Sequence, residues 1–224
     1  MEDFASKGSQ RWLQVAVNRK PDLLLSALQR SGAVAPGVPV TWSSPLESEN
    51  FQEYRDLQAL ERTRVGNLKR PLNEFWPARG PVWDALATTS EGPLFVEAKA
   101  HIAEADSPAT KASPESRKLI EQSLAEARGF YAPKATASWG NVFYQYANRL
   151  AYHYFLQHVN GIPSRLVFLY FVNAADIEPT TEEEWHGAVR LIHAVLGLPK
   201  DLTRFGVFDA FLDTRLLQDA IDSN

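Results

Sequence analysis

Cysteine is absent from the sequence, and methionine occurs only once. Without cysteine, the chain can form neither disulfides nor thiolate metal sites, and cysteine-based catalysis is excluded. A protein without disulfides fits a reducing compartment. The first residues, MEDFASKGSQRW, contain no apolar stretch of the kind that forms the centre of a secretory signal. We therefore expect a cytoplasmic protein.

Long apolar runs are also missing. The longest run, Leu166 to Val172, is far shorter than the roughly 20 residues that span a bilayer, so we expect no membrane insertion. The sequence also lacks the G-x-G-x-x-G, G-x-x-x-x-G-K-[ST] and G-x-S-x-G motifs. Their absence leaves no support for a Rossmann dehydrogenase, a P-loop nucleotide hydrolase or a serine hydrolase.

The charge of the chain is slightly acidic and uneven. The net charge is −4, while residues 1–134 hold 17 basic and 17 acidic residues, so the excess acid lies in residues 135–224. Such a balance opposes a strong overall attraction to nucleic acid. Basic residues gather in the first part, at Arg62, Arg64, Lys69, Arg70 and Arg79. The simplest interpretation of this basic cluster is a set of solvated charges on helix faces.

The composition is that of one globular domain. The chain has 224 residues, of which 45% are hydrophobic and 22% charged, and no shift in composition marks a second domain. We divide this single domain, 1–224, into three parts. These are an N-terminal helical extension over 1–48, a core over 49–175, and a C-terminal helix and strand over 176–224.

Helical and strand-like segments alternate along the chain. Helical patterns and caps predict helices over 9–18, 22–30, 47–67, 113–127, 141–158 and 180–198. Apolar runs and turn signals predict strands over 81–88, 93–101, 165–174 and 205–214, with a short extended stretch near 40–45. The first two strands form an antiparallel hairpin, and a helical crossover allows the second to pair in parallel with 165–174. This order predicts an α/β fold with helices flanking a mixed central sheet.

The second hairpin strand carries a row of polar side chains. Because side chains alternate along a strand, Leu94, Val96, Ala98 and Ala100 share one face, and Phe95, Glu97, Lys99 and His101 share the other. Asp84 precedes the turn and can lie close to Glu97 across the strand pair. Two adjacent carboxylates repel each other unless a cation lies between them. Oxygen ligands suit Mg²⁺ or Mn²⁺, and Lys99 can stabilise a nearby attacking water or a phosphate charge.

This pattern, D-x12-E-x-K across a hairpin followed by helices and an apolar strand, resembles the PD-(D/E)xK nuclease superfamily with its restriction-endonuclease-like fold. The phrase FWPARGPVWDALA…LFVEAKAH is also similar to a bacterial branch of that superfamily. The resemblance covers about residues 50–175. It implies that Asp84, Glu97 and the carbonyl of Ala98 hold a divalent metal and that Lys99 acts on the water. The proline of the family motif is absent, because Asp84 follows Trp83.

The function that follows is a Mg²⁺- or Mn²⁺-dependent nuclease that hydrolyses phosphodiester bonds in DNA. The alternative is a catalytically inactive, nuclease-like module that binds protein or nucleic acid. A third possibility is a metal-dependent hydrolase of another phosphate ester. Because many members of the superfamily are dimers, the resemblance also implies a possible homodimer.

Three further residues are candidates for accessory roles. Glu53 is the acid we favour in the preceding helix, ahead of Glu49 and Glu61. Gln145 matches a helical glutamine that some members of the superfamily use, and Gln122 is its competitor. His101 extends the row of Glu97 and Lys99 and can line the rim of the site or contact phosphate, although histidines at strand ends are more often ordinary polar caps.

Overall fold

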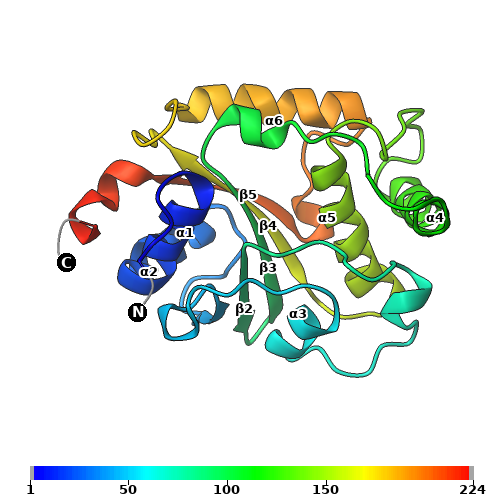
Figure 1. The fold of residues 1–224 in the computed structure, drawn as a ribbon, viewed down its shortest axis with the longest axis horizontal. Coiled ribbons are helices and arrows are strands. Elements are labelled where there is room, and N and C mark those ends of the chain that lie inside the picture. Colours follow the sequence, from blue (N-terminus) through cyan, green and yellow to red (C-terminus); the bar gives the residue numbers. More distant parts are fainter. Residues whose placement is uncertain (1–2, 222–224) are drawn as a thin grey trace.

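The structure, a computed structural model, describes residues 3–221 and contains a five-stranded sheet between two layers of helices (Figure 1). The strands, in their order across the sheet, are β1 (Thr41–Ser44), β2 (Ala85–Thr89), β3 (Gly92–Lys99), β4 (Arg165–Val172) and β5 (Val207–Asp213). Strands β1, β2 and β3 pair antiparallel, whereas β3, β4 and β5 pair parallel. The predicted mixed α/β class, with its hairpin and its parallel pair, is therefore confirmed.

Helices cover both faces of the sheet. One face packs against α1 (Gly8–Arg19) and α2 (Pro21–Arg30), and the other against α3 (Asp56–Arg62), α4 (Pro114–Tyr131), α5 (Tyr144–Tyr154) and α6 (Glu182–Leu196). A π-helical turn, Phe155–Val159, continues α5. Figure 1 shows α1 and α2 on one side of the strands and α4 and α5 on the other.

The alternation of side chains in β3 separates the two cores. Leu94, Val96 and Ala98 are buried against the layer of α1 and α2, whereas Phe95 is buried in the core beneath α5. This is the predicted division of faces. Strand β4 is buried along nearly its whole length, as expected for an interior strand with helices on both faces. The face that carries Phe95 is therefore the one on which Glu97 and Lys99 meet α5.

Two expected boundaries in the N-terminal half are wrong. The helix expected over 47–67 is reduced to a 3-10 turn at Glu47–Glu49 and the short α3. Between them, Asn50 and Phe51 have positive φ angles of 52° and 56°, which interrupt a helix. The backbone N–H of Trp83 donates to the Tyr54 carbonyl at 2.9 Å. This bond pairs Tyr54 with the segment that leads into the hairpin, so the chain is not helical at Tyr54. The hairpin strand expected from residue 81 begins at Ala85.

Side-chain caps mark the starts of two helices. Thr181 caps α6 in a capping box with Glu184, and Ser113 caps α4 through its side chain. Helix α1 begins at Gly8, after Lys7, without a side-chain cap. Within residues 3–221, no helix combines the length and the apolar character needed to cross a bilayer.

Candidate metal and catalytic site

Glu97 lies at the carboxyl end of β3 and is 1% exposed. Lys99, two residues further along the same face, forms an ion pair with Glu97 Oε1. Arg149 reaches the same carboxylate from α5, and its Nε donates to Glu97 Oε2 at 2.6 Å. Both carboxylate oxygens therefore face a cation. Such pairing is what allows a charged carboxylate to be buried in a protein core.

Arg149 is held on several sides. Its Nη2 donates to the Val82 carbonyl at 2.7 Å, and its Nη1 donates to Asn148 Oδ1 at 2.8 Å. The guanidinium also lies over the Trp83 ring, 4.9 Å from the ring centroid. Arg149 thereby joins α5 to the start of the hairpin. Sequence reasoning gave it no role. The signal in the sequence was an arginine among the many aromatic residues of this helix. An arginine in such an apolar helix is expected to be buried, and a buried arginine requires partners.

Asp84 lies beside this pair, immediately before β2. Ala85 is opposite Val96 in the antiparallel register, so the next position along the pair brings Asp84 opposite Glu97. Ala85 and Val96 both pack toward α1 and α2, and alternation directs Asp84 to the other face, with Glu97. Its Oδ2 accepts a hydrogen bond from the Ala98 N–H at 2.7 Å. The structure thus brings Asp84, Glu97 and Lys99 together.

The three groups have different protonation preferences. Burial and the nearby charge of Glu97 raise the pKa of Asp84 to about 7. Burial acts to raise the pKa of Glu97 as well, but Arg149 and Lys99 outweigh it and hold that pKa below its usual value. For Lys99, burial is outweighed by Glu97 and Asp84, and its pKa is raised. At neutral pH, Glu97 and Lys99 are therefore charged, and Asp84 is close to its midpoint.

This difference predicts a pH-dependent effect of Asp84→Asn on metal-free protein. The contribution of Asp84 to the stability of wild-type protein is lost as the pH rises from about 4 to about 7, because folded Asp84 keeps its proton to a higher pH than the unfolded residue does. The Asp84→Asn variant has no titrating group at this position, so its stability does not include this pH-dependent loss. We expect its free energy of unfolding to match that of wild type near pH 4 and to exceed it by about 1–3 kcal/mol at pH 8.

Urea denaturation in the presence of a chelator, at several pH values between 4 and 8, measures this difference. Titrating groups remote from Asp84 are common to both proteins and cancel in the comparison. A stability difference that does not change with pH would contradict the environment described for Asp84.

The donor atoms around Asp84 suit a hard divalent cation. The N–H and C=O of a strand residue point to the same edge of the strand, so the Ala98 carbonyl lies on the edge of β3 from which the Ala98 N–H reaches Asp84. Two carboxylates and a carbonyl are the oxygen ligands that Mg²⁺ and Mn²⁺ prefer. Residues 3–221 contain no cluster of three or more histidine or acidic side chains able to hold a metal. Binding to Glu97 requires one of its cationic partners to give way.

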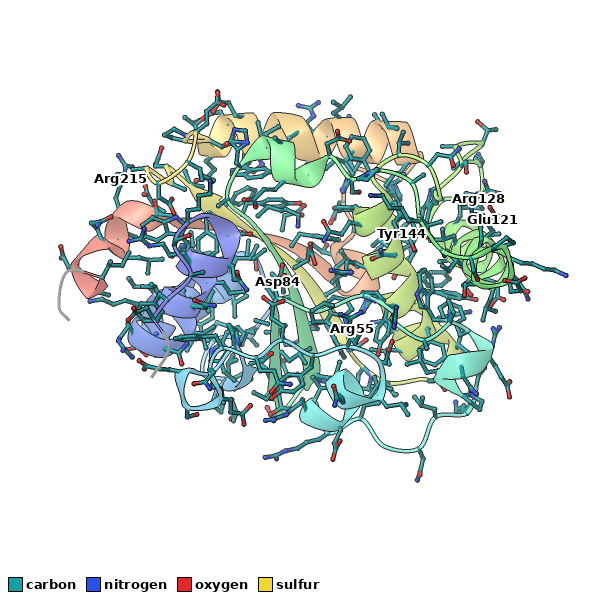
Figure 2. All side chains as sticks on the ribbon, viewed as in Figure 1. Arg55, Asp84, Glu121, Arg128, Tyr144 and Arg215 are labelled. Carbon is teal, nitrogen blue, oxygen red and sulfur yellow. The ribbon has the colours of Figure 1, made fainter. Side chains whose placement is uncertain are left out.

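A groove of about 640 Å³ opens beside Asp84. Its lining comes from the loop before α3, the start of the hairpin, the loop of residues 106–111, and α5: Glu53, Val82, Asp84, Asp106, Ser107, Pro108, Ala109, Thr110, Lys111, Tyr144, Gln145, Asn148 and Arg149. In Figure 2, Asp84 lies near the centre of the view, with Tyr144 of α5 above it and to its right. Of the two carboxylates, Asp84 lines this groove, whereas Glu97 lies behind it in the small cavity that it shares with Lys99.

Two of the accessory candidates line this groove. Glu53 lies in an irregular segment before α3 and not in the expected helix. Its Oε1 accepts from Gln10 Nε2 at 3.2 Å, and burial, together with the charge of Glu97, raises its pKa. Gln145 lines both the groove and a small cavity behind Glu97 and Lys99. The structure therefore adds Glu53 and Gln145 to the surroundings of the site.

The remaining candidates lie elsewhere. His101 follows the end of β3 and caps the 3-10 turn Ile102–Ala105, with its Nδ1 accepting from the Ala103 N–H at 3.0 Å. Its Nε2 lies 3.1 Å from Glu178 Oε2. Glu49 pairs with Arg62 at 2.7 Å, and Gln122 is exposed on α4. Glu61 lines a separate apolar pocket next to α3.

Comparison with known proteins gives no relative for this arrangement. No protein-family model, no curated protein and no solved structure matches the chain.

Proposed function

We propose that the chain is a Mg²⁺- or Mn²⁺-dependent nuclease of the PD-(D/E)xK type, with a restriction-endonuclease-like core, and that it hydrolyses phosphodiester bonds in DNA. One observation carries the proposal: Asp84, Glu97 and Lys99 share one sheet face, where Asp84 lines the open groove and Glu97 and Lys99 line the small cavity next to it. The hairpin that carries them, and the parallel pairing of β3 with β4 after intervening helices, agree with the sequence resemblance. Ligands of open α/β sheets commonly bind at the carboxyl ends of the strands, where this site lies.

The proposed roles follow from charge. Asp84, Glu97 and the Ala98 carbonyl would hold the cation, which would supply Lewis-acid stabilisation of the phosphate. Lys99 is protonated at neutral pH because Glu97 and Asp84 raise its pKa. It is therefore a donor that orients the attacking water and stabilises negative charge on the phosphate, and it does not serve as a general base.

The lining of the groove is acidic on balance. Glu53, Asp84 and Asp106 contribute three acidic groups, Lys111 contributes one basic group, and the cationic head of Arg149 is paired with Glu97. A polyanion is repelled by such a lining until a divalent ion offsets its charge. Part of the basic cluster is likewise engaged, since Arg62 pairs with Glu49 and Arg70 with Glu126. We therefore expect weak DNA binding without metal.

The test is cleavage of labelled DNA and RNA substrates, single- and double-stranded, with Mg²⁺, with Mn²⁺ and with a chelator. We expect metal-dependent DNA cleavage by wild-type protein, and its loss in Asp84→Asn. That variant should also lose saturable Mn²⁺ binding measured by calorimetry, because the substitution removes the charged ligand. Asp219, outside the groove, provides the matched control as Asp219→Asn. Absence of cleavage by wild type on every substrate, or equal cleavage by wild type and Asp84→Asn, would refute the catalytic proposal.

A second candidate is a nuclease-like module that binds protein or nucleic acid without catalysis. The occupation of both Glu97 oxygens by Lys99 and Arg149 favours it, because a site already neutralised by its own cations has less need of metal. Wild-type protein that shows no Mn²⁺ binding by calorimetry, yet retards a nucleic acid or a protein partner, would support this candidate over the nuclease.

A further inference from the structure

The most closely held cation near the site is Arg149, whose side chain is only 4% exposed. It contacts Glu97, the Val82 carbonyl, Asn148 and the Trp83 ring at once. These contacts use the planar fork of the guanidinium, which lysine cannot reproduce. Although Arg149 lines the groove, its guanidinium nitrogens are engaged by these partners, so that it serves the carboxylate and not a phosphate.

Glu97 has two oxygens and two cationic partners. Lys99 pairs with Oε1, and Arg149 with Oε2. Asp84, in contrast, uses Oδ2 for the Ala98 N–H and faces the open groove. A divalent ion that approaches from the groove can therefore meet Asp84 directly, but it meets a Glu97 carboxylate that is already neutralised.

We infer that Arg149 is a positioning residue that acts as the internal counter-ion of Glu97, and that it sets the affinity of the site for metal by competing for Oε2. This inference rests on the proposed function. In the metal-free site, Arg149 keeps Glu97 charged and turned toward α5. When a cation binds, Arg149 gives up its bond to Oε2 while its bonds to Val82 and Asn148 hold it nearby. The site thereby responds to the concentration of the ion.

Calorimetric titration with Mn²⁺ tests the competition. Removal of a positive charge next to a cation site strengthens binding, so Arg149→Gln should bind Mn²⁺ at least about tenfold more tightly than wild type. Arg149→Lys keeps the charge and should stay within about threefold of wild type. Arg165→Gln, which breaks the ion pair with Glu91 at the opposite end of the sheet, is the matched control and should leave the affinity unchanged.

The outcomes separate this inference from the proposed function. Equal Mn²⁺ affinity in wild type and Arg149→Gln, or weaker binding in the variant, overturns the inference and leaves the nuclease proposal standing. Absence of Mn²⁺ binding in both proteins overturns both.

A second measurement uses wild-type protein and does not depend on the folding of Arg149→Gln. The Arg149 Nε–H resonance in a ¹⁵N spectrum can be assigned by its absence from the spectrum of Arg149→Lys. Titration with Mg²⁺ should shift this resonance in a saturable manner, because Nε leaves Glu97. A resonance that stays unchanged at saturating Mg²⁺ overturns the inference.

Discussion

Replacing Glu97 with alanine is expected to lower the free energy of unfolding by about 3–5 kcal/mol. Glu97 is 1% exposed and receives Lys99 on one oxygen and Arg149 on the other. Its removal leaves two buried cations facing each other across an empty space. The cost of an uncompensated buried charge exceeds the modest value of the ion pair itself.

Urea denaturation of wild type and Glu97→Ala at pH 7 measures this loss, and a thermal scan should show a midpoint lower by about 10 °C or more. The matched control is Glu91→Ala, which removes a more exposed partner of Arg165, 29% exposed. Its expected cost is about 1 kcal/mol or less. Adding Arg149→Met to Glu97→Ala should recover part of the lost stability, since it removes one of the stranded charges. If Glu97→Ala lowered the free energy of unfolding no more than Glu91→Ala does, the Glu97 carboxylate would not be the group that neutralises Lys99 and Arg149.

The sheet was predictable from the sequence because its signals are local. The apolar run in β4 and the turn between β2 and β3 specify these strands without help from distant residues. Alternation in β3 correctly assigned Leu94, Val96 and Ala98 to one core and Phe95 to the other. The same periodicity brings Glu97 and Lys99 to a shared face. The two central residues of the candidate site therefore followed from one strand alone.

The segment before the hairpin was not predictable in the same way. Its apolar spacing suggested one helix over 47–67, with Leu57 on the buried face. In the structure Leu57 is 66% exposed, and Tyr54 pairs with Trp83 in an isolated bridge. Helix propensity is a weak preference that such a tertiary contact overrides. Glu53 reaches the groove because this segment is not helical.

The contact between Arg149 and Glu97 could not be predicted from the sequence, because 52 positions separate the two residues and no local pattern relates them. Their contact depends on how α5 packs over the end of β3. The same is true of the hydrogen bond from the Ala98 N–H to Asp84, which lies immediately before the first residue of β2. Motif reasoning gave the residue types of the site. Packing determines which of their oxygens are already engaged, and hence how strongly a cation must compete.

Replacing Lys99 with methionine is expected to reduce metal-dependent DNA cleavage by about 10²- to 10³-fold, the usual effect of removing one donor that stabilises transition-state charge. Methionine preserves most of the aliphatic volume of this half-buried side chain, so the loss should come from the ammonium group. Mn²⁺ binding should persist in Lys99→Met, because Asp84 and the Ala98 carbonyl are unaltered and a competing cation has been removed.

The combination of retained metal binding and lost cleavage separates Lys99 from the ligands, since Asp84→Asn should lose both. Single-turnover cleavage rates and Mn²⁺ calorimetry on the same preparations measure the two properties. Lys118→Met on the exposed surface of α4 is the control and should cleave at the wild-type rate. Cleavage by Lys99→Met at the wild-type rate would show that Lys99 has no role in the reaction. Loss of Mn²⁺ binding in that variant would instead show that Lys99 is needed for the metal site. A protonated Lys99 that pairs with Glu97 but is not itself a metal ligand accounts for both expected results.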